Sequence, residues 1–213
     1  MEKILLIGAG GHAKTIVDTI ERLGTYEIVG FADENNIDSE VYRGYKVLGS
    51  DRDCDDFFSR GIKYAFLSIG YMGKTDIRRR LYEKYHRAGF VFPVIVDPEA
   101  VVASDARIGE GTYIGRNAVV NADSSVGMNC IINTAAVVEH ECSIGDFSHI
   151  AVAAAVCGRT QIGCDCMVGA NATIIQGIAI GDEVVVGAGS VVLKNIESRS
   201  VVVGNPAVLK SLK

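Results

Sequence analysis

The 213-residue sequence has no tryptophan, only three prolines, and only 7% aromatic residues. A chain with so few rings must fill its core with small aliphatic side chains. Basic residues are also in the minority, since 21 Lys and Arg face 26 Asp and Glu and leave a formal net charge of −5. Non-specific affinity for nucleic acid or for an anionic membrane rests on basic charge. The composition therefore excludes a generic binder of either kind.

Long hydrophobic runs and metal-binding motifs are missing as well. No apolar run approaches the roughly 20 residues that a membrane-spanning helix needs, and the opening apolar stretch is too short for a signal peptide. Of the six cysteines only Cys164 and Cys166 are closely spaced, and they do not form a CxxC motif. We therefore expect no metal site, reduced thiols packed as small hydrophobic side chains, and a cytoplasmic protein.

The first half of the chain alternates short apolar runs with amphipathic stretches. Apolar runs at 3–7, 27–32 and 64–69 predict strands, and the patterns at 12–23, 54–60 and 76–88 predict helices. A strand, a glycine turn, a helix and a second strand form a βαβ unit, which indicates a parallel sheet with flanking helices. We predict a Rossmann-like α/β domain over residues 1–95.

The second half follows a six-residue period. Every sixth residue from Val102 to Val192 is Val or Ile, and the residue four positions after each is usually small. Such a run predicts a parallel β-helix of hexapeptide repeats, because stacked coils bury a core that no single repeat can bury. We place this all-β domain and a short C-terminal segment at residues 96–213. Three cysteines, Cys130, Cys142 and Cys166, fall in the small core position.

Three stretches carry a resemblance to a known family. They are GAGGHAK at 8–14, VVEHECSIG with the following FSH at 137–149, and VGNPA at 203–207. Together they resemble the sialic-acid O-acetyltransferase-like or bacillosamine (UDP-4-amino-sugar) N-acetyltransferase-like family of hexapeptide-repeat acyltransferases, over nearly the whole chain. The resemblance implies a left-handed coil, a homotrimer, and acetyl-CoA as co-substrate. Asp97 departs from the family, which commonly has a histidine at the entrance to the β-helix.

The glycine-rich turn at residues 8–11 is a candidate nucleotide site, because glycines before a helix leave backbone N–H groups free for phosphates. GAGGH is not GxGxxG, so a nucleotide diphosphate fits better than a dinucleotide; a tight turn without a ligand is the alternative. The resemblance implies binding of a nucleotide-linked sugar through Gly10, Gly11 and His12. Further substrate-binding candidates, each with a plain surface or turn role as its alternative, are Asp33, Glu34 and Gly49.

His140 is the candidate catalytic residue. It lies between Glu139 and Glu141, and a neighbouring carboxylate can fix the tautomer of an imidazole and raise its basicity. An ordinary surface histidine is the alternative. The resemblance implies that His140 is the general base, that Glu141 tunes it, and that the acetyl-CoA contacts are His149, Ala170 and Ala188. A polar coil corner and plain repeat packing are the alternatives for these last three residues.

These features predict an acetyl-CoA-dependent N-acetyltransferase of a nucleotide-linked amino sugar, with a UDP-4-amino-4,6-dideoxy sugar as the foremost substrate. Direct transfer is favoured over a covalent route, because no cysteine is well placed as a nucleophile and Cys142 belongs to the core. One alternative is O-acetylation of a sialic or related nonulosonic acid. Another is a non-catalytic β-helix protein that binds a nucleotide sugar. The sequence alone names neither the nucleobase nor the sugar.

Overall fold

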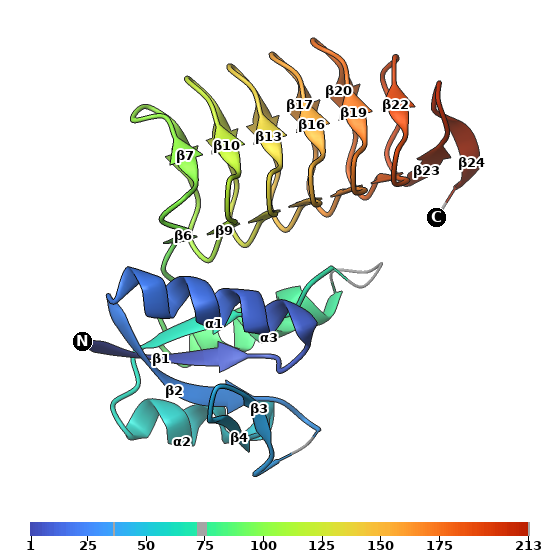
Figure 1. Cartoon of the computed structure of the whole chain (residues 1–213). Coiled ribbons are helices and arrows are strands. Elements are labelled where there is room, and N and C mark those ends of the chain that lie inside the picture. Colours follow the sequence, from blue (N-terminus) through green and yellow to red (C-terminus); the bar gives the residue numbers. More distant parts are fainter. Residues whose placement is uncertain (36, 72–75, 213) are drawn as a thin grey trace. The chain divides into compact units, whose positions relative to one another are not determined.

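The computed structural model describes residues 1–35, 37–71 and 76–212. The chain forms two compact units, Met1–Ile95 and Val96–Lys213. The first unit mixes helices with a sheet, and the second is built from short strands (Figure 1). Among the described residues, no helix is long and apolar enough to cross a membrane.

The first unit contains a five-stranded sheet in the order β3-β4-β2-β1-β5. Strands β1, β2, β4 and β5 are parallel, and β3 is antiparallel to β4. The strands are β1 (Glu2–Ile7), β2 (Tyr26–Ala32), β3 (Glu40–Tyr42), β4 (Tyr45–Gly49) and β5 (Tyr64–Leu67). The helices are α1 (Gly11–Leu23), the 3₁₀ turn η1 (Asp51–Asp53), α2 (Cys54–Ser59) and α3 (Asp76–Arg87).

The hydrophobic pattern explains these elements. The last four residues of β1 are buried, and α1 buries one apolar face and ends at Gly24, whose φ of 63° is left-handed. The predicted strands and helices are confirmed to within two residues. The β3–β4 hairpin was not predicted, because its strands are short and largely exposed and carry little periodic signal. Since β1 lies between β2 and β5, a crevice opens at the carboxyl ends of these strands.

The second unit is a left-handed β-helix with three parallel sheets. Paired residues such as Val120, Val138 and Val156 are 18 positions apart, so three hexads make one coil. One sheet contains β7 (Val101–Val102), β10 (Val119–Val120), β13 (Val137–Val138), β16 (Ala155–Val156), β19 (Thr173–Ile174) and β22 (Val191–Val192). The next contains β8 (Arg107–Ile108), β11 (Ser125–Val126), β14 (Ser143–Ile144), β17 (Gln161–Ile162) and β20 (Ala179–Ile180).

The third sheet is closed at its end by an antiparallel strand. It contains β6 (Ile95–Val96), β9 (Tyr113–Ile114), β12 (Ile131–Ile132), β15 (His149–Ile150), β18 (Met167–Val168), β21 (Val185–Val186), β23 (Ser200–Val203) and β24 (Val208–Leu212). Only a short C-terminal segment was predicted here, whereas the structure forms β23 and antiparallel β24. The six-residue period stops before them and therefore could not reveal them.

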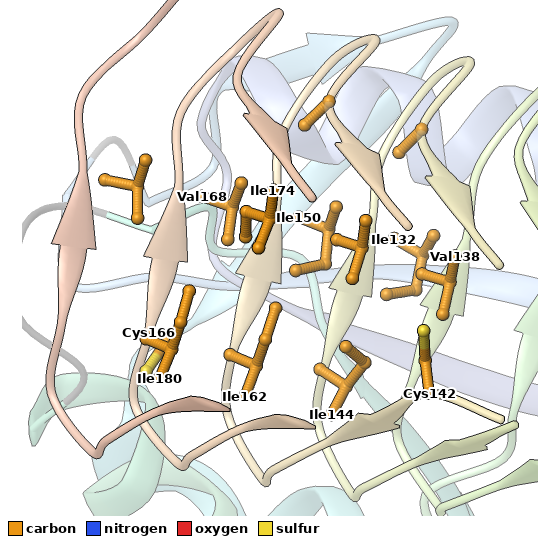
Figure 2. Packing of buried hydrophobic residues seen from close by; sticks show 14 of the residues in the cluster. Ile132, Val138, Cys142, Ile144, Ile150, Ile162, Cys166, Val168, Ile174 and Ile180 are labelled. Atoms are coloured by element: carbon orange, nitrogen blue, oxygen red, sulfur yellow. The ribbon is translucent and has the colours of Figure 1, made fainter. Parts of the chain in front are cut away.

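The β-helix core is a ladder of branched side chains. Figure 2 shows this packing, including Ile132 of β12, Val138 of β13 and Ile150 of β15. The cysteines of the small position are buried among them, as predicted. One corner residue in most hexads has a positive φ, which is 59° at Glu141 and 60° at Arg159. This regular corner sets which surface side chains lie above one another in neighbouring coils.

Candidate active site

A cavity of about 450 Å³ lies in the α/β unit at the carboxyl ends of β1, β2 and β5. Its wall includes the glycine turn and the residue after it, Gly8 to His12, together with residues that follow the other two strands. No side chain caps the start of α1, so the first backbone N–H groups of this helix face a site suited to anions. Of the predicted substrate-binding residues, the wall contains Gly10, Gly11, His12, Asp33 and Glu34.

The carboxylate of Asp33 organises this wall. One oxygen accepts the N–H of Ala9 at 2.9 Å, and the other accepts the N–H of Asn35 at 2.9 Å. Ser68 adds a second tie, because its hydroxyl contacts the carbonyl oxygens of Ile7 and Gly8. Asp33 therefore fixes the glycine turn relative to the end of β2. The sequence argument considered it as a ligand contact or an ordinary surface acid, and did not find its bond to the glycine turn.

The glycines of the site differ in what they require. Gly8 has a φ of 99°, and a side chain there would overlap Ile69. A Cβ at Gly10 or Gly11 would meet nothing within 4 Å, and neither residue has a positive φ. Backbone strain is thus a property of Gly8 rather than of Gly11. Gly49 does not line the cavity; its carbonyl accepts the Asp33 N–H at 3.0 Å.

His12 has an unusual protonation behaviour. Burial of the ring, reinforced by the positive charge of Arg78, lowers its pKa to about 4. The imidazole is therefore neutral near pH 7 and can donate one hydrogen bond. A neutral donor at the start of α1 adds to the backbone groups that face the cavity. Arg80 supplies positive charge to the described part of the wall, and Asp51 supplies a further carboxylate.

The second candidate site lies at a corner of the β-helix, just after β13. The Nδ1 atom of His140 is 3.0 Å from Oε2 of Glu141, and the His140 side chain is 54% exposed. A carboxylate at Nδ1 keeps the ring proton on that nitrogen and leaves the lone pair on Nε2. Arg159 donates from Nε to the same Glu141 oxygen at 3.0 Å. Arg159 and then His140 lower the pKa of Glu141, so it remains an anion.

His140 faces a surface depression of about 430 Å³. Gly158 lies one coil further on, directly beneath the ring, and a Cβ there would be 2.6 Å from Nε2. Only glycine therefore allows the ring to lie in this position. The wall also includes Cys157, Arg159 and Gln176. Sequence reasoning missed these residues, although a coil length of three hexads places position 158 next to 140.

His149 is buried in β15, with 8% of its surface exposed. Asn133 uses its side-chain oxygen to accept the N–H of Thr134 at 2.8 Å, so its amide nitrogen is the atom 3.0 Å from Nε2 of His149. Nε2 therefore accepts a hydrogen bond, and the ring proton is on Nδ1. The sequence argument found His149 but not its partner Asn133.

Ala170 and Ala188 lie one above the other at the corner that follows the third sheet. The N–H of Gly189 donates to the carbonyl of Ala170 at 2.8 Å, which fixes this register. Ala170 is half-buried and Ala188 is exposed. His140 belongs to a different corner, the one that follows the first sheet. One chain therefore carries these predicted residues on two separate edges.

Two other predictions concern the entrance to the β-helix and metals. Asp97 is 1% exposed, its carboxylate accepts the N–H of Glu99 at 3.0 Å, and Arg116 approaches it to 3.8 Å. It therefore caps the turn that enters the first coil.

Within the described ranges, no group of three or more His, Cys, Asp or Glu side chains is arranged to hold a metal ion.

Comparison with known proteins follows the same division. Residues 3–85 match the family described as the PglD N-terminal domain, and residues 159–194 match the hexapeptide repeat of succinyl-transferase. No curated protein matches the chain by sequence.

Solved structures of two related proteins are among those that match the chain over nearly its whole length. A histidine-to-alanine mutant of GDP-perosamine N-acetyltransferase from Caulobacter crescentus, in complex with CoA and GDP-perosamine, is 30% identical with a TM-score of 0.92, covering 99% of this chain and 98% of that one. The acetyltransferase domain of PglB from Neisseria gonorrhoeae is 35% identical with a TM-score of 0.91, covering 99% and 100%. That domain in complex with acetyl coenzyme A is similar at 35% identity, covering 98% of this chain and 99% of that one, with a TM-score of 0.90.

The fold and the histidine corner define a hexapeptide-repeat acyltransferase with an α/β N-terminal domain. Sequence identity of 30–35% to these proteins over nearly the whole chain also identifies the family. The chain belongs to the family of sugar N-acetyltransferases that combine a PglD-type N-terminal domain with a hexapeptide β-helix. The predicted fold class, family and enzyme class are confirmed.

Proposed function

We propose that this enzyme transfers an acetyl group from acetyl-CoA to the amino group of a nucleotide-linked amino sugar. The observation that carries the proposal is the Glu141–His140 pair, in which Nδ1 of His140 lies 3.0 Å from the Glu141 carboxylate while the imidazole lines an open surface depression. Similar proteins in complex with CoA and GDP-perosamine, or with acetyl coenzyme A, support the substrate classes. The α/β cavity is the site that we assign to the nucleotide.

The chemistry of the α/β cavity suits a nucleoside diphosphate. The uncapped start of α1, the neutral His12 and the cation Arg80 supply donors for phosphate oxygens. The carboxylates of Glu34 and Asp51 lie in the same wall and suit hydroxyl or N–H groups of a ribose and base. Gly10 and Gly11 contribute open space for the ligand, whereas Gly49 acts through the Asp33 backbone.

His140 acts as the general base in our mechanism. Nε2 takes a proton from the acceptor amine as its nitrogen attacks the thioester carbonyl and the C–N bond forms. Backbone N–H groups stabilise the oxyanion of the tetrahedral intermediate. The C–S bond then breaks, and His140 returns the proton to the thiolate of CoA. Glu141 holds the tautomer, and direct transfer requires no covalent enzyme intermediate.

The acyl donor site in this proposal needs more than one chain. His149 lies in the third sheet, and Ala170 and Ala188 lie at the corner that follows it. His140 lies at the corner that follows the first sheet. In a three-fold assembly, the corner with His140 of one subunit would lie against the corner with Ala170 and Ala188 of its neighbour. The two corners together would then complete the site. Sedimentation at micromolar concentration should then report three times 22.7 kDa. A monomer that remains fully active would contradict this arrangement.

We assign the enzyme to the cytoplasm. All six cysteines are free thiols in the structure, and reduced thiols are typical of that compartment. Acetyl-CoA and nucleotide sugars are also cytoplasmic metabolites of the class that this reaction consumes. Fractionation of cells that express the chain tests the assignment.

Purified protein with acetyl-CoA and UDP-, GDP- and CMP-linked amino sugars, monitored by release of free thiol, tests the reaction. We expect turnover with a UDP-4-amino-4,6-dideoxy sugar. Matched hydroxyl sugars and sialic acid test O-acetylation. Turnover of sialic acid alone would replace the proposal with O-acetylation, and binding without turnover of any sugar would replace it with a non-catalytic role.

A further inference from the structure

Two corners of the β-helix carry the same glutamate–arginine arrangement. Glu141 and Glu183 have φ values of 59° and 57°, and Arg159 and Arg199 have values of 60° and 62°. Nε of Arg159 is 3.0 Å from Glu141, and Nε of Arg199 is 3.3 Å from Glu183. The backbone N–H of each arginine donates to the carbonyl of the residue before the glutamate, at 2.9 and 2.8 Å. The two corners are therefore a matched pair.

They differ in the residue that precedes the glutamate. At the first corner it is His140, whose Nδ1 shares the Glu141 oxygen with Arg159. At the second it is Asp182, whose carboxylate accepts the N–H of Cys164 at 2.7 Å. The arginine at the first corner thus contacts a group that itself holds an imidazole, whereas the arginine at the second does not.

Stability does not explain the first contact. The side chains of His140, Glu141 and Arg159 are 54%, 43% and 71% exposed, and exposed ion pairs contribute little to folding. Orientation does explain it. Glutamate is a flexible side chain, and a second donor on Oε2 restricts where this oxygen can lie. Because Gly158 supports the ring from below, a fixed Oε2 also fixes the direction in which Nε2 points.

We propose that Arg159 is a positioning residue for the His140 base, acting through Glu141. This inference rests on the proposed function of His140. Arg159 keeps the carboxylate directed at Nδ1, so that the ring proton is held on that nitrogen and the imidazole keeps its orientation in the depression where the acceptor amine would lie. It has no direct role in the bond-making steps.

Four variants test the inference: Arg159→Gln, Arg159→Lys, the matched control Arg199→Gln, and His140→Ala. We expect Arg159→Gln to lower kcat about 10- to 100-fold, by analogy with the loss of a group that orients a metal-ligating histidine, with little change in either KM. Arg159→Lys should recover most of kcat. Arg199→Gln should match the wild type, and all three arginine variants should keep the wild-type melting temperature.

Several results would overturn the inference. They are an unchanged kcat in Arg159→Gln, a raised KM with unchanged kcat, which would make Arg159 a substrate contact, and an equal loss in Arg199→Gln, which would indicate a general effect of corner contacts. In each case an inactive His140→Ala would leave the proposed function in place. An active His140→Ala would instead remove the base on which both depend.

Discussion

The two units of this chain build sites in opposite ways. The α/β unit encloses a cavity with loops at the ends of parallel strands, and its histidine, His12, is shielded enough that its pKa falls to about 4. The β-helix has a filled core, so its site lies on an outer corner, where His140 is 54% exposed. A cavity can be complete within one chain. A corner gains an enclosed environment only when another surface covers it.

The largest effect that separates the two sites should come from His140→Ala. Loss of a general base typically lowers kcat by roughly 10²–10⁴-fold. Because the side chain is half exposed and lies outside the core, binding of acetyl-CoA and the melting temperature should stay near those of the wild type. Steady-state kinetics at saturating substrates check this. His86→Ala, on the exposed face of α3, is the control. Near-normal turnover in His140→Ala would contradict the assignment of His140 as the general base.

The effect of the half-buried His12 should instead appear in the pH dependence of stability. His12 has a pKa of about 4 in the fold against an ordinary value of 6.5, so the unfolded chain binds the extra proton between these values. The free energy of unfolding of the α/β unit should therefore fall as pH falls below 6.5, by at most roughly 3 kcal/mol at pH 4. Amide hydrogen exchange in β1 at pH 7.5 and pH 5 measures it.

His12→Asn is the matched variant, because asparagine is polar but does not titrate. It should lose about 2 kcal/mol less than the wild type between those two pH values. An identical loss in both proteins would show that His12 is not the group responsible.

The sequence predicted the β-helix in more detail than the α/β unit, because only the β-helix has a repeating pattern. In the β-helix the six-residue period located the strands and the buried cysteines, since every coil repeats one pattern. The contact between Glu141 and Arg159 joins positions 18 apart, so it could be predicted only once the number of residues per coil was known. In the α/β unit the tie from Asp33 to Ala9 depends on the exact path of the backbone, which no local pattern encodes.

Gly11→Val should have a smaller effect that is confined to one substrate. Gly11 lines the cavity and a Cβ there meets nothing within 4 Å, so the fold should tolerate valine while the side chain occupies ligand space. We expect KM for the nucleotide sugar to rise at least about tenfold, or about 1.4 kcal/mol. Calorimetry should find acetyl-CoA affinity unchanged.

Gly8→Val is the contrasting variant for this experiment. Its φ of 99° and its overlap with Ile69 should lower the melting temperature of the α/β unit, which circular dichroism records. If folded Gly11→Val kept its affinity for the sugar nucleotide, the cavity would not be the nucleotide site. If it lost acetyl-CoA binding instead, the roles of the two units would be exchanged.

The smallest effect should come from Cys157→Ala, which tests whether the exposed corner hides a nucleophile. The sequence argument considered Cys142, and the structure buries that thiol against the carbonyl of Cys157 and raises its pKa through burial. Cys157, however, lines the depression beside His140. Direct transfer predicts that kcat of Cys157→Ala stays within about threefold of the wild type, as for substitutions away from critical contacts. Cys164→Ala, half-buried at another corner, is the control.

Two results together would establish a covalent route through Cys157. One is a loss of kcat near that of His140→Ala, and the other is an acetylated chain in the mass spectrum of wild type incubated with acetyl-CoA alone. His140 would then activate a thiol rather than the sugar amine, and the corner would carry out both half-reactions.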